Sequence, residues 1–485
     1  MNTKHYDVIV FGENLAGLVA AALLAARKYT VLLVRRVAGP ERDLFFGQSA
    51  ARDRLVVPNC FNAPVPSAVL RELNLGHRVR SLFKTVAPLF QYVDPSRRIN
   101  VWAERTRLAM ELQRDYGAAA RPDDVGDLLS ALEETNYQFD KLLVPSLPFH
   151  PDGLREKWEL AGLVKEFARS LAEMASPADR LEALWTDTPF GRLVRRVEGF
   201  SSEAGDGFDA RFGWRRAGLM LQELLYRVGG EGVDELLIET FEKRSGHILE
   251  QTALQELDVG RNDFTFHDAK NTYTAQFVVC AFDFFLLPQL FQDRKAEKFV
   301  SQTLERVRPA HVWLKVSFLT DGQLVPEGMS YNLFYDPPGA DVPYFFARDP
   351  AAPEDAEMER VDLFYRAPAE AVGAEALGAI QGEAIDHAKD LMPFMTEHLR
   401  KVYLEKPAPT APEDKLVALA GRRILYATRG DEGLFNGAPY TLPFKNAYLA
   451  GPEVLPELGM EGEFIAGWAV ARQIVRKQPR KDDLR

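Results

Sequence analysis

The sequence predicts an α/β protein, and two segments at opposite ends of the chain carry this prediction. Near the N-terminus, an apolar run at 7–11 leads into a glycine turn at 12–17, an alanine-rich helical stretch and a second apolar run at 30–35. Near the C-terminus, an apolar run at 447–450 precedes a loop and a helical pattern that opens at 459. Strands and helices that alternate in this way form a sheet covered by helices.

The glycine turn has the spacing of a dinucleotide-binding turn, with one glycine replaced. In the pattern G-x-G-x-x-G the first glycine makes the tight turn, the second lets the backbone approach a pyrophosphate, and the third lets the helix pack against the strand. Gly12 and Gly17 occupy the first and third places, and Asn14 occupies the second. Leu15 and Ala16 begin the helix, where free N–H groups and the helix dipole favour an anion. Asn14 takes up space beside that anion, although its amide can donate a hydrogen bond.

Two arginines end the second strand, where a dinucleotide fold ordinarily has an acid that accepts hydrogen bonds from ribose hydroxyls. Arg35 and Arg36 cannot accept such bonds, but either can pair with a phosphate. Three interpretations follow from this change. A dinucleotide is held with its ribose in another way, the arginines face a 2′-phosphate or the pyrophosphate, or the unit serves only as core and binds nothing.

The composition excludes several classes of protein. With 485 residues the chain exceeds one core and suggests two interlocked domains. A net charge of −11 argues against nucleic-acid binding, which favours a basic surface. Cys60 and Cys280 indicate neither a disulfide framework nor a metal cluster, and Cys280 lies in an apolar run typical of a buried strand. Because glycines and polar residues interrupt the apolar stretch 8–26, we expect no transmembrane segment, a cytoplasmic protein and at most peripheral membrane contact.

Three segments carry a resemblance to a known superfamily. The N-terminal unit is followed by Gly39 and Arg42, near the place of a G-G-R turn whose arginine meets a pyrophosphate. Residues 246–287 look like a strand pair that lays its backbone against adenine, with Leu254 at the contact position. Residues 446–467 have the order of a terminal strand, an A-G turn and a G-x-E-G helix start. Together these segments resemble the flavin-dependent amine oxidase and phytoene desaturase superfamily, which binds FAD.

The resemblance implies where the flavin would lie at the C-terminal end of the chain. In that superfamily the last helix points its N-terminus at the flavin ring, and Gly459, Met460 and Gly462 match these positions. Helix N–H groups there stabilise the negative charge of a reduced flavin. Gly451 matches the A-G turn, and Glu453 matches the acid that meets the flavin side chain, displaced here by an intervening proline.

Other side chains near these segments have open or structural interpretations. Glu463 replaces a small residue beside the ring, where it either opposes a reduced flavin or points to solvent. Lys315 is expected on a solvated strand face, and the run that includes Phe282, Phe284 and Phe285 is expected in the core. Hydride transfer to a flavin needs an oriented substrate and a dry cavity more than an acid–base pair, so we assign no catalytic residue.

The superfamily builds its flavin domain from separated segments and inserts a substrate domain between them. We therefore expect a Rossmann-like FAD-binding domain, an inserted mixed α+β substrate domain and a flexible tail at 479–485. The expected boundaries are 1–60, 205–290 and 440–478 for the first domain, and 61–204 and 291–439 for the second. Hydrophobic spacing predicts helices over 160–174, 221–228 and 377–404, with Pro393 kinking the last of them.

Two main functions fit these features. The first is an FAD-dependent oxidoreductase of the desaturase or amine oxidase type, which transfers hydride from an apolar substrate to flavin. The second is a non-catalytic subunit of a larger complex, with the same fold and with FAD binding lost or altered. A third interpretation makes Arg35, Arg36 and Arg42 the wall of a site for another phosphate-rich ligand. The expected partner is an apolar small molecule or a protein, and the oligomeric state stays open.

Overall fold

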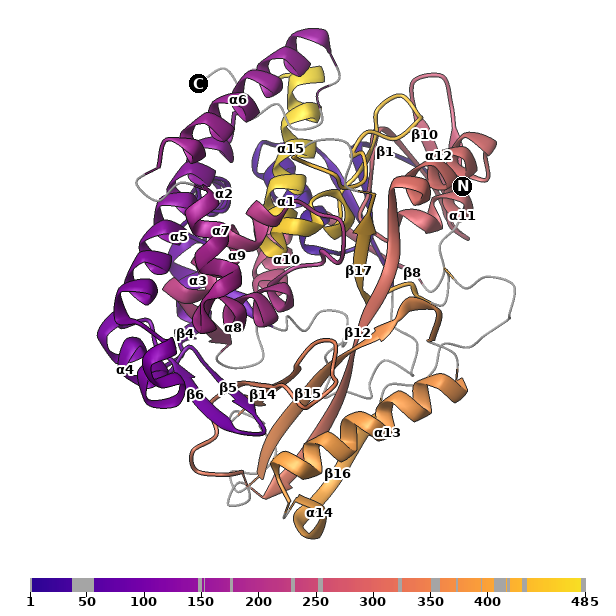
Figure 1. The fold of residues 1–485 in the computed structure, drawn as a ribbon. Helices are drawn as coiled ribbons and strands as arrows, with labels where there is room; N and C mark the ends of the chain where they lie inside the picture. The colour runs from indigo at the N-terminus through magenta and orange to yellow at the C-terminus, as the bar shows by residue number, and fades with distance from the viewer. Residues whose placement is uncertain are drawn as a thin grey trace.

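The computed structural model describes most of the chain, and Figure 1 shows its arrangement. The described residues are 2–36, 56–146, 151, 153–174, 178–227, 232–251, 256–321, 325–349, 358–371, 374–393, 395–404, 416, 419–429 and 434–480.

A seven-stranded sheet brings the two ends of the chain together. Its central strand β1 pairs in parallel with β2 on one side and β11 on the other, and β18 continues the parallel pairing along β11. The buried halves of these strands are apolar, as a sheet covered on both faces requires. In order across the sheet the strands are β8 (His247–Gln251), β2 (Val31–Arg36), β1 (Asn2–Phe11), β11 (Asn271–Cys280), β10 (Phe264–His267) and β9 (Leu257–Val259), with β18 (Ala447–Leu449) beside β11.

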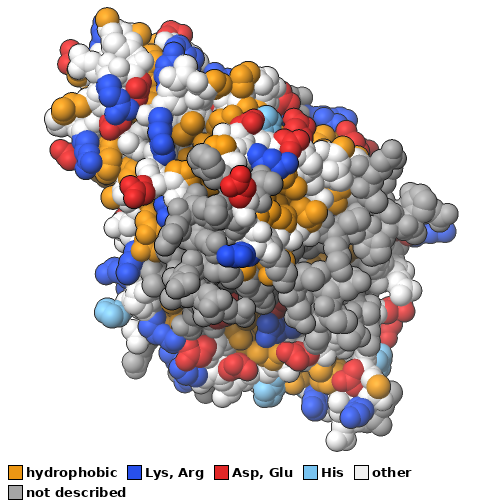
Figure 2. Space-filling view, turned by 90° about the horizontal axis from the view of Figure 1, so that it is seen from below, with side chains coloured by type: hydrophobic (Ala, Val, Ile, Leu, Met, Phe, Trp, Pro, Cys, Tyr) orange, Lys and Arg blue, Asp and Glu red, His pale blue; other side chains and the backbone are white. Residues whose placement is uncertain are grey.

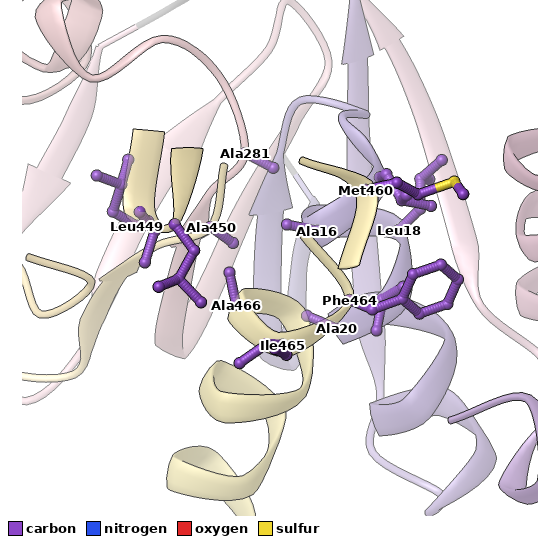
Figure 3. Packing of buried hydrophobic residues seen from close by; sticks show 14 of the residues in the cluster. Ala16, Leu18, Ala20, Ala281, Leu449, Ala450, Met460, Phe464, Ile465 and Ala466 are labelled. Atoms are coloured by element: carbon purple, nitrogen blue, oxygen red, sulfur yellow. The ribbon is translucent and has the colours of Figure 1, made fainter. Parts of the chain in front are cut away.

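Helix α1 (Leu15–Ala26) is buried between the sheet and helix α15 (Met460–Lys477). Small side chains allow the two helices to approach closely, as Figure 3 shows around Ala16, Ala20 and Ala466. At the crossing, a Cβ atom added to Gly467 would lie 2.3 Å from the carbonyl oxygen of Ala16. Helices α10 (Val233–Lys243) and α2 (Pro64–Glu72) complete this layer.

This crossing gives a test of the packing. Gly467→Ala is expected to lower the free energy of unfolding by about 1–3 kcal/mol, because the added methyl group forces the helices apart. The loss outweighs the gain of about 1 kcal/mol that alanine brings to a helix. Gly382→Ala is the matched control, since a Cβ there meets no atom within 4 Å, and it is expected to stabilise the protein. Thermal unfolding of both variants decides the point, and equal stabilisation by both would contradict it.

A second sheet, of eight strands, lies beside the first and is built on the long strand β12 (Val307–Asp321). Alternate residues of β12 belong to different core clusters. Trp313 packs with apolar residues of the helices within 105–222, called the helical layer below, whereas Leu314 and Val316 belong to the cluster that also includes residues of α13 (Ala374–Leu391). Figure 1 shows α13 along one side of this sheet and helices α4 to α9 on the other. The remaining strands of the sheet are β16 (Leu399–Leu404), β15 (Met358–Pro368), β14 (Tyr344–Asp349), β13 (Asn332–Tyr335), β5 (Phe90–Asp94), β6 (Arg97–Val101) and β17 (Arg423–Thr428).

The helical layer and short elements account for the rest of the described fold. A three-stranded sheet joins β3 (Val57–Pro58), β7 (Leu224–Arg227) and β4 (Phe83–Thr85). The other α-helices are α3 (Gly76–Leu82), α4 (Arg105–Tyr116), α5 (Pro122–Leu142), α6 (Leu154–Ala172), α7 (Ala178–Asp187), α8 (Pro189–Val197), α9 (Ala210–Gln222), α11 (Leu287–Phe291), α12 (Arg294–Arg306) and α14 (Met395–His398). The short 3₁₀ helices are η3 (Gly117–Ala119), η4 (Glu198–Ser201), η5 (Phe284–Leu286), η7 (Ala369–Ala371), η9 (Pro452–Val454) and η10 (Pro456–Leu458).

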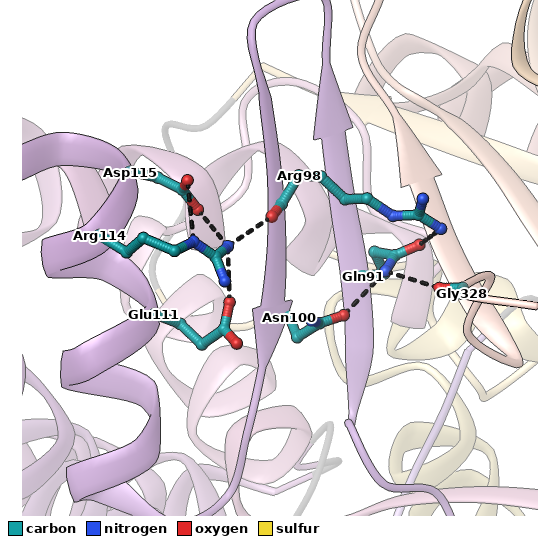
Figure 4. A network of polar contacts seen from close by, with 7 residues as sticks. All are labelled: Gln91, Arg98, Asn100, Glu111, Arg114, Asp115 and Gly328. Carbon is teal, nitrogen blue, oxygen red and sulfur yellow. Dashed lines mark hydrogen bonds and ion pairs between the residues drawn. The ribbon is translucent and has the colours of Figure 1, made fainter.

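Polar contacts fix the β5–β6 hairpin to its neighbours (Figure 4). Arg114 of α4 donates to the Arg98 carbonyl at 2.9 Å, and its guanidinium pairs with Glu111 at 2.8 Å. On the other side of the hairpin, Gln91 donates to Asn100 at 2.8 Å and to the Gly328 carbonyl at 3.1 Å. The hairpin, which lies at the edge of the second sheet, is therefore held to α4 through Arg114 and to the chain at Gly328 through Gln91.

Two of the local predictions were wrong. The segment 221–228 is not one helix: α9 ends at Gln222, and Leu224 and Leu225 lie in β7, which pairs with β3 and β4. The segment 377–404 is not one helix: α13 ends at Leu391, the short helix α14 spans Met395–His398, and the last residues form β16, which pairs with β12. In both cases pairing with distant strands decided the structure over a helical spacing of apolar residues.

The surface carries charges of both signs. On the face shown in Figure 2, basic and acidic side chains are interspersed over the described residues, without a continuous basic stripe. Within the described part of the chain, no helix is long and apolar enough to cross a membrane.

Candidate functional site

The turn between β1 and α1 has the backbone geometry that its glycines predict. Gly12 has φ +98°, and a Cβ atom there would lie 2.1 Å from the carbonyl oxygen of Ala281 at the end of β11. A Cβ atom on Gly17 would lie 2.2 Å from the Cβ of Ala281. Only glycine fits at both places, so the strand and the helix can approach closely. Leu15 and Ala16, which follow the turn, are buried at the start of α1.

The side chain of Asn14 forms hydrogen bonds within this turn and to the turn after β18. Asn14 is the N-cap of α1, and its Oδ1 accepts a hydrogen bond from the Gly17 N–H at 2.9 Å. Its Nδ2 donates to the carbonyl oxygen of Ala450 at 2.8 Å. Ala450 follows β18 directly, so the asparagine joins the first turn of the sheet to the last. Both polar atoms of the side chain are thus used within the protein.

A second internal pair lies at the end of β2. The Nε atom of Arg35 is 2.5 Å from Oε2 of Glu13, the residue between Gly12 and Asn14. Both side chains are largely buried, at 26% and 13% exposure. The ion pair therefore engages the arginine that was predicted to face ribose or phosphate. Arg36 ends β2 opposite Gln251 in the register, and Arg42 and Leu254 lie outside the described residues.

A fully buried carboxyl group lies at the A-G turn. Glu453 is 0% exposed, and neither of its oxygens has a hydrogen-bond partner in the described chain. The carboxyl folds back over Gly451, where an added Cβ would lie 2.3 Å from Glu453 Oε2. Burial, and then the neighbouring carboxylate of Asp283, raises the pKa of Glu453 well above its usual range. This environment favours the neutral form of the Glu453 carboxyl group.

Further acidic groups surround Glu453. Burial raises the pKa of Asp283 to about 6, although its carboxylate accepts a hydrogen bond from the Gly421 N–H at 2.8 Å. Tyr426 is 1% exposed, and its hydroxyl has no partner in the described chain. Burial, and then Glu453, raises the pKa of Tyr426 well above its usual range. Glu463, whose orientation the sequence left open, is 5% exposed and does not point to solvent.

Helix α15 begins against protein backbone. Gly459 precedes it, and a Cβ there would lie 2.2 Å from the carbonyl oxygen of Ser201. A Cβ on Gly462 would lie 2.4 Å from the carbonyl oxygen of Leu455. Met460 is buried, and no side chain caps the helix. The predicted helix start is thus present, packed closely by η4 and by the segment that precedes it.

The sequence missed two acids and misplaced one lysine. Glu457 is 0% exposed, and Asp283 lies beside Glu453; both follow apolar residues, which is the signal that could have found them. The prediction of a solvated Lys315 was wrong, because its side chain is 1% exposed and lowers the pKa of buried Asp362. Phe284 and Phe285 are in the core as predicted, and Cys280 is buried as predicted.

Comparison with known proteins identifies the fold. No protein-family model and no curated protein matches the sequence. Among solved structures, cyclohexylamine oxidase from Brevibacterium oxydans is 13% identical, with 98% of this chain and 100% of that chain covered and a TM-score of 0.52. Putrescine oxidase bound to putrescine is 14% identical, with 99% and 100% covered and a TM-score of 0.52. An oxidoreductase from Methanosarcina mazei is 13% identical, with 96% and 99% covered and a TM-score of 0.56.

The chain has the amine oxidase fold. The predicted fold class, a Rossmann-like unit joined to a mixed α+β part, is thereby confirmed, as is the superfamily resemblance at the level of fold. At this level of identity the likeness fixes the architecture, and function has to be argued from the site.

The described residues of this amine oxidase fold do not fit FAD held in the superfamily's usual way. The second glycine position, where a pyrophosphate would approach the backbone, holds the Asn14 side chain bonded to Gly17 and Ala450. Arg35 is paired with Glu13, so its charge is already balanced. Protein atoms enclose Glu453 fully, so a flavin side chain would have to displace them to contact it.

Proposed function

We propose that this protein is a non-catalytic relative of the flavin-dependent amine oxidases, which keeps their fold and acts without FAD as a subunit of a larger assembly. The observation that carries the proposal is the Asn14 bridge between Gly17 and Ala450. The Asn14 side chain forms hydrogen bonds to both turns at this edge of the sheet, and it occupies the space that a pyrophosphate would need. The Glu13–Arg35 pair and the enclosed Glu453 support the same conclusion at neighbouring positions.

A second candidate is an FAD-dependent oxidoreductase of the desaturase or amine oxidase type with an apolar substrate. Two observations favour it: α15 begins without a side-chain cap, and the pKa of Asp362, which is buried in the second sheet, is lowered by the cations of Lys315 and Arg360. Uncapped N–H groups can stabilise an anion, and perturbed ionisable groups often mark functional sites. This candidate requires the Asn14 side chain to move away from Ala450.

The proposal extends to organisation and location. We assign 1–60, 205–290 and 440–478 to an FAD-binding-type domain and 61–204 and 291–439 to a second domain, since each set supplies the strands of one large sheet. The second set includes β5, β6, β12 and β15, for example. The chain has only two cysteines, Cys60 and Cys280, and both are buried, which indicates no disulfide framework of the kind typical of secreted proteins; we place the protein in the cytoplasm.

Flavin binding tests the proposal directly. The purified full chain is expected to be colourless and to release no flavin on denaturation. Added FAD is expected to leave thermal unfolding unchanged, whereas a ligand at a hundred times its dissociation constant adds about 2.7 kcal/mol. A yellow protein that releases FAD in a one-to-one ratio would overturn the proposal in favour of the second candidate.

The Asn14→Gly variant tests whether the Asn14 side chain is what prevents FAD binding. It restores the second glycine at a cost of about 1 kcal/mol for the lost hydrogen bonds. Thr188→Gly is the matched control, because Thr188 caps α8 by the same contact, accepting from the Gly191 N–H at 3.0 Å. FAD binding that appears in Asn14→Gly and not in Thr188→Gly assigns the block to the asparagine. Binding in neither variant leaves the enclosed acids as the block.

A further inference from the structure

A groove remote from the Asn14 turn lies between the second half of α15 and the first turns of α6. The chain at 144–146 closes one end of it, and its volume is about 280 Å³. This volume is close to the lower limit of small-molecule sites in proteins. The groove does not share a residue with the turns at Gly12 or Gly451, so a ligand can occupy it whether or not FAD binds.

The floor of the groove is apolar. Val65, Tyr440 and Ile465 are buried beneath it, at 2%, 1% and 4% exposure. The half-buried indole of Trp468 forms one wall, and its Nε1 donates to the Pro145 carbonyl at 3.1 Å. A ligand that contacts this floor has to present hydrocarbon or an aromatic ring.

The rim of the groove is charged, with an excess of cations. Three arginines and two glutamates line it: Arg155, Arg472, Arg476, Glu156 and Glu159. Arg476 forms an ion pair with Glu156, and Arg472 donates to the Pro145 carbonyl at 2.9 Å. Arg155 is exposed and makes no ion pair or hydrogen bond within the described chain. A guanidinium in this position is suited to binding a carboxylate.

Helix α6, which supplies part of the rim, also carries exposed apolar side chains. Trp158 is 77% exposed and Leu154 is 78% exposed, on the same helix as Arg155 and Glu159. Large apolar side chains exposed together mark contact sites more often than isolated ones do.

We propose that this groove binds a free carboxylic acid with a medium-length alkyl chain, whose chain lies on Ile465 and Trp468 and whose carboxylate pairs with Arg155 and Arg472. The apolar floor favours the alkyl chain of the ligand, and the excess of arginines at the rim favours its carboxylate.

Titration calorimetry of the full chain with decanoate and with decan-1-ol tests the proposal. Decanoate is expected to bind one-to-one and at least tenfold more tightly than the alcohol. Binding of decanoate, and not of the alcohol, is expected to weaken as salt is raised, because exposed charges are screened. Equal binding of the two, or no binding of decanoate at millimolar concentration, overturns the proposal.

Variants then locate the site. The double variant Arg155→Gln, Arg472→Gln is expected to weaken decanoate at least tenfold and to leave the alcohol unchanged. Lys445→Gln removes a cation from a different surface groove and is expected to change neither. Trp468→Ala is expected to weaken both ligands. If decanoate binds the double variant as it binds the unmodified protein, the carboxylate is not held at this rim and the assignment fails.

Discussion

Replacing Arg215 by methionine is expected to lower the free energy of unfolding by about 3–5 kcal/mol. Arg215 lies on α9 with its side chain 1% exposed, and it pairs with Glu461, which is also 1% exposed. Its Nη2 donates to Glu461 Oε1 at 2.7 Å and its Nε to Oε2 at 3.1 Å. The variant leaves that carboxylate buried without its partner, which is the costly way to break an ion pair.

The position of the pair explains why the effect should be global. Glu461 belongs to the first turn of α15, and Arg215 also donates to the Asn136 carbonyl of α5 at 3.1 Å. A second carboxylate, on Asp140 of α5, lies 2.7 Å from Nη2 of Arg215. The guanidinium therefore joins the helical layer to the helix that covers the first sheet.

Chemical unfolding followed by tryptophan fluorescence measures the loss, with two comparisons. Arg180→Met removes an exposed pair with Asp127 and is expected to cost less than about 1 kcal/mol. The double variant Arg215→Met, Glu461→Leu is expected to regain most of the stability, because it leaves no fully buried charge unpaired, and the Asp140 side chain is 42% exposed to solvent. If Arg215→Met costs no more than Arg180→Met, the buried pair does not join these layers in the way described.

Where a pattern is local, the sequence predicted the structure well. The strands β1 and β2, the turn at Gly12 and the helix from Met460 all follow from residues within one or two turns of each other. The failures involve long-range pairing. Leu224 and Leu225 have helical spacing, yet they join β3 and β4 in a sheet that no local pattern reveals.

The chemistry of the candidate site was less accessible from sequence. The glycine replaced by Asn14 was visible, but the acceptor of its amide, Ala450, is 436 residues away. The sequence therefore showed that a position had changed, and only the fold showed that its side chain bonds to the other turn. The prediction for Lys315 failed for a related reason. The alternation of residues along β12 shows on which face of the strand a side chain lies, but it does not show whether another layer covers that face.

A second large effect is expected at Glu457. The variant Glu457→Gln should raise the free energy of unfolding by about 3 kcal/mol at pH 7. Burial raises the pKa of Glu457 from 4.5 to about 8, although backbone N–H groups and Arg216 offset part of the shift. Both carboxyl oxygens are inaccessible to solvent. The folded protein therefore keeps this acid protonated at pH 7, while the unfolded chain ionises it.

The sign of the pH dependence follows from proton binding. Between about pH 4.5 and about pH 8 the folded state binds more protons at Glu457 than the unfolded state, so the free energy of unfolding falls as pH rises. Glutamine has the same shape and cannot ionise, so the stability gain of Glu457→Gln should be near zero at pH 4.5 and grow toward pH 8. Unfolding curves across this range measure the gain, and Glu327→Gln, at an exposed position, should show none. Parallel pH profiles for Glu457→Gln and the unmodified protein would mean that the Glu457 carboxyl group ionises in the folded state, and that it is better solvated than its burial indicates.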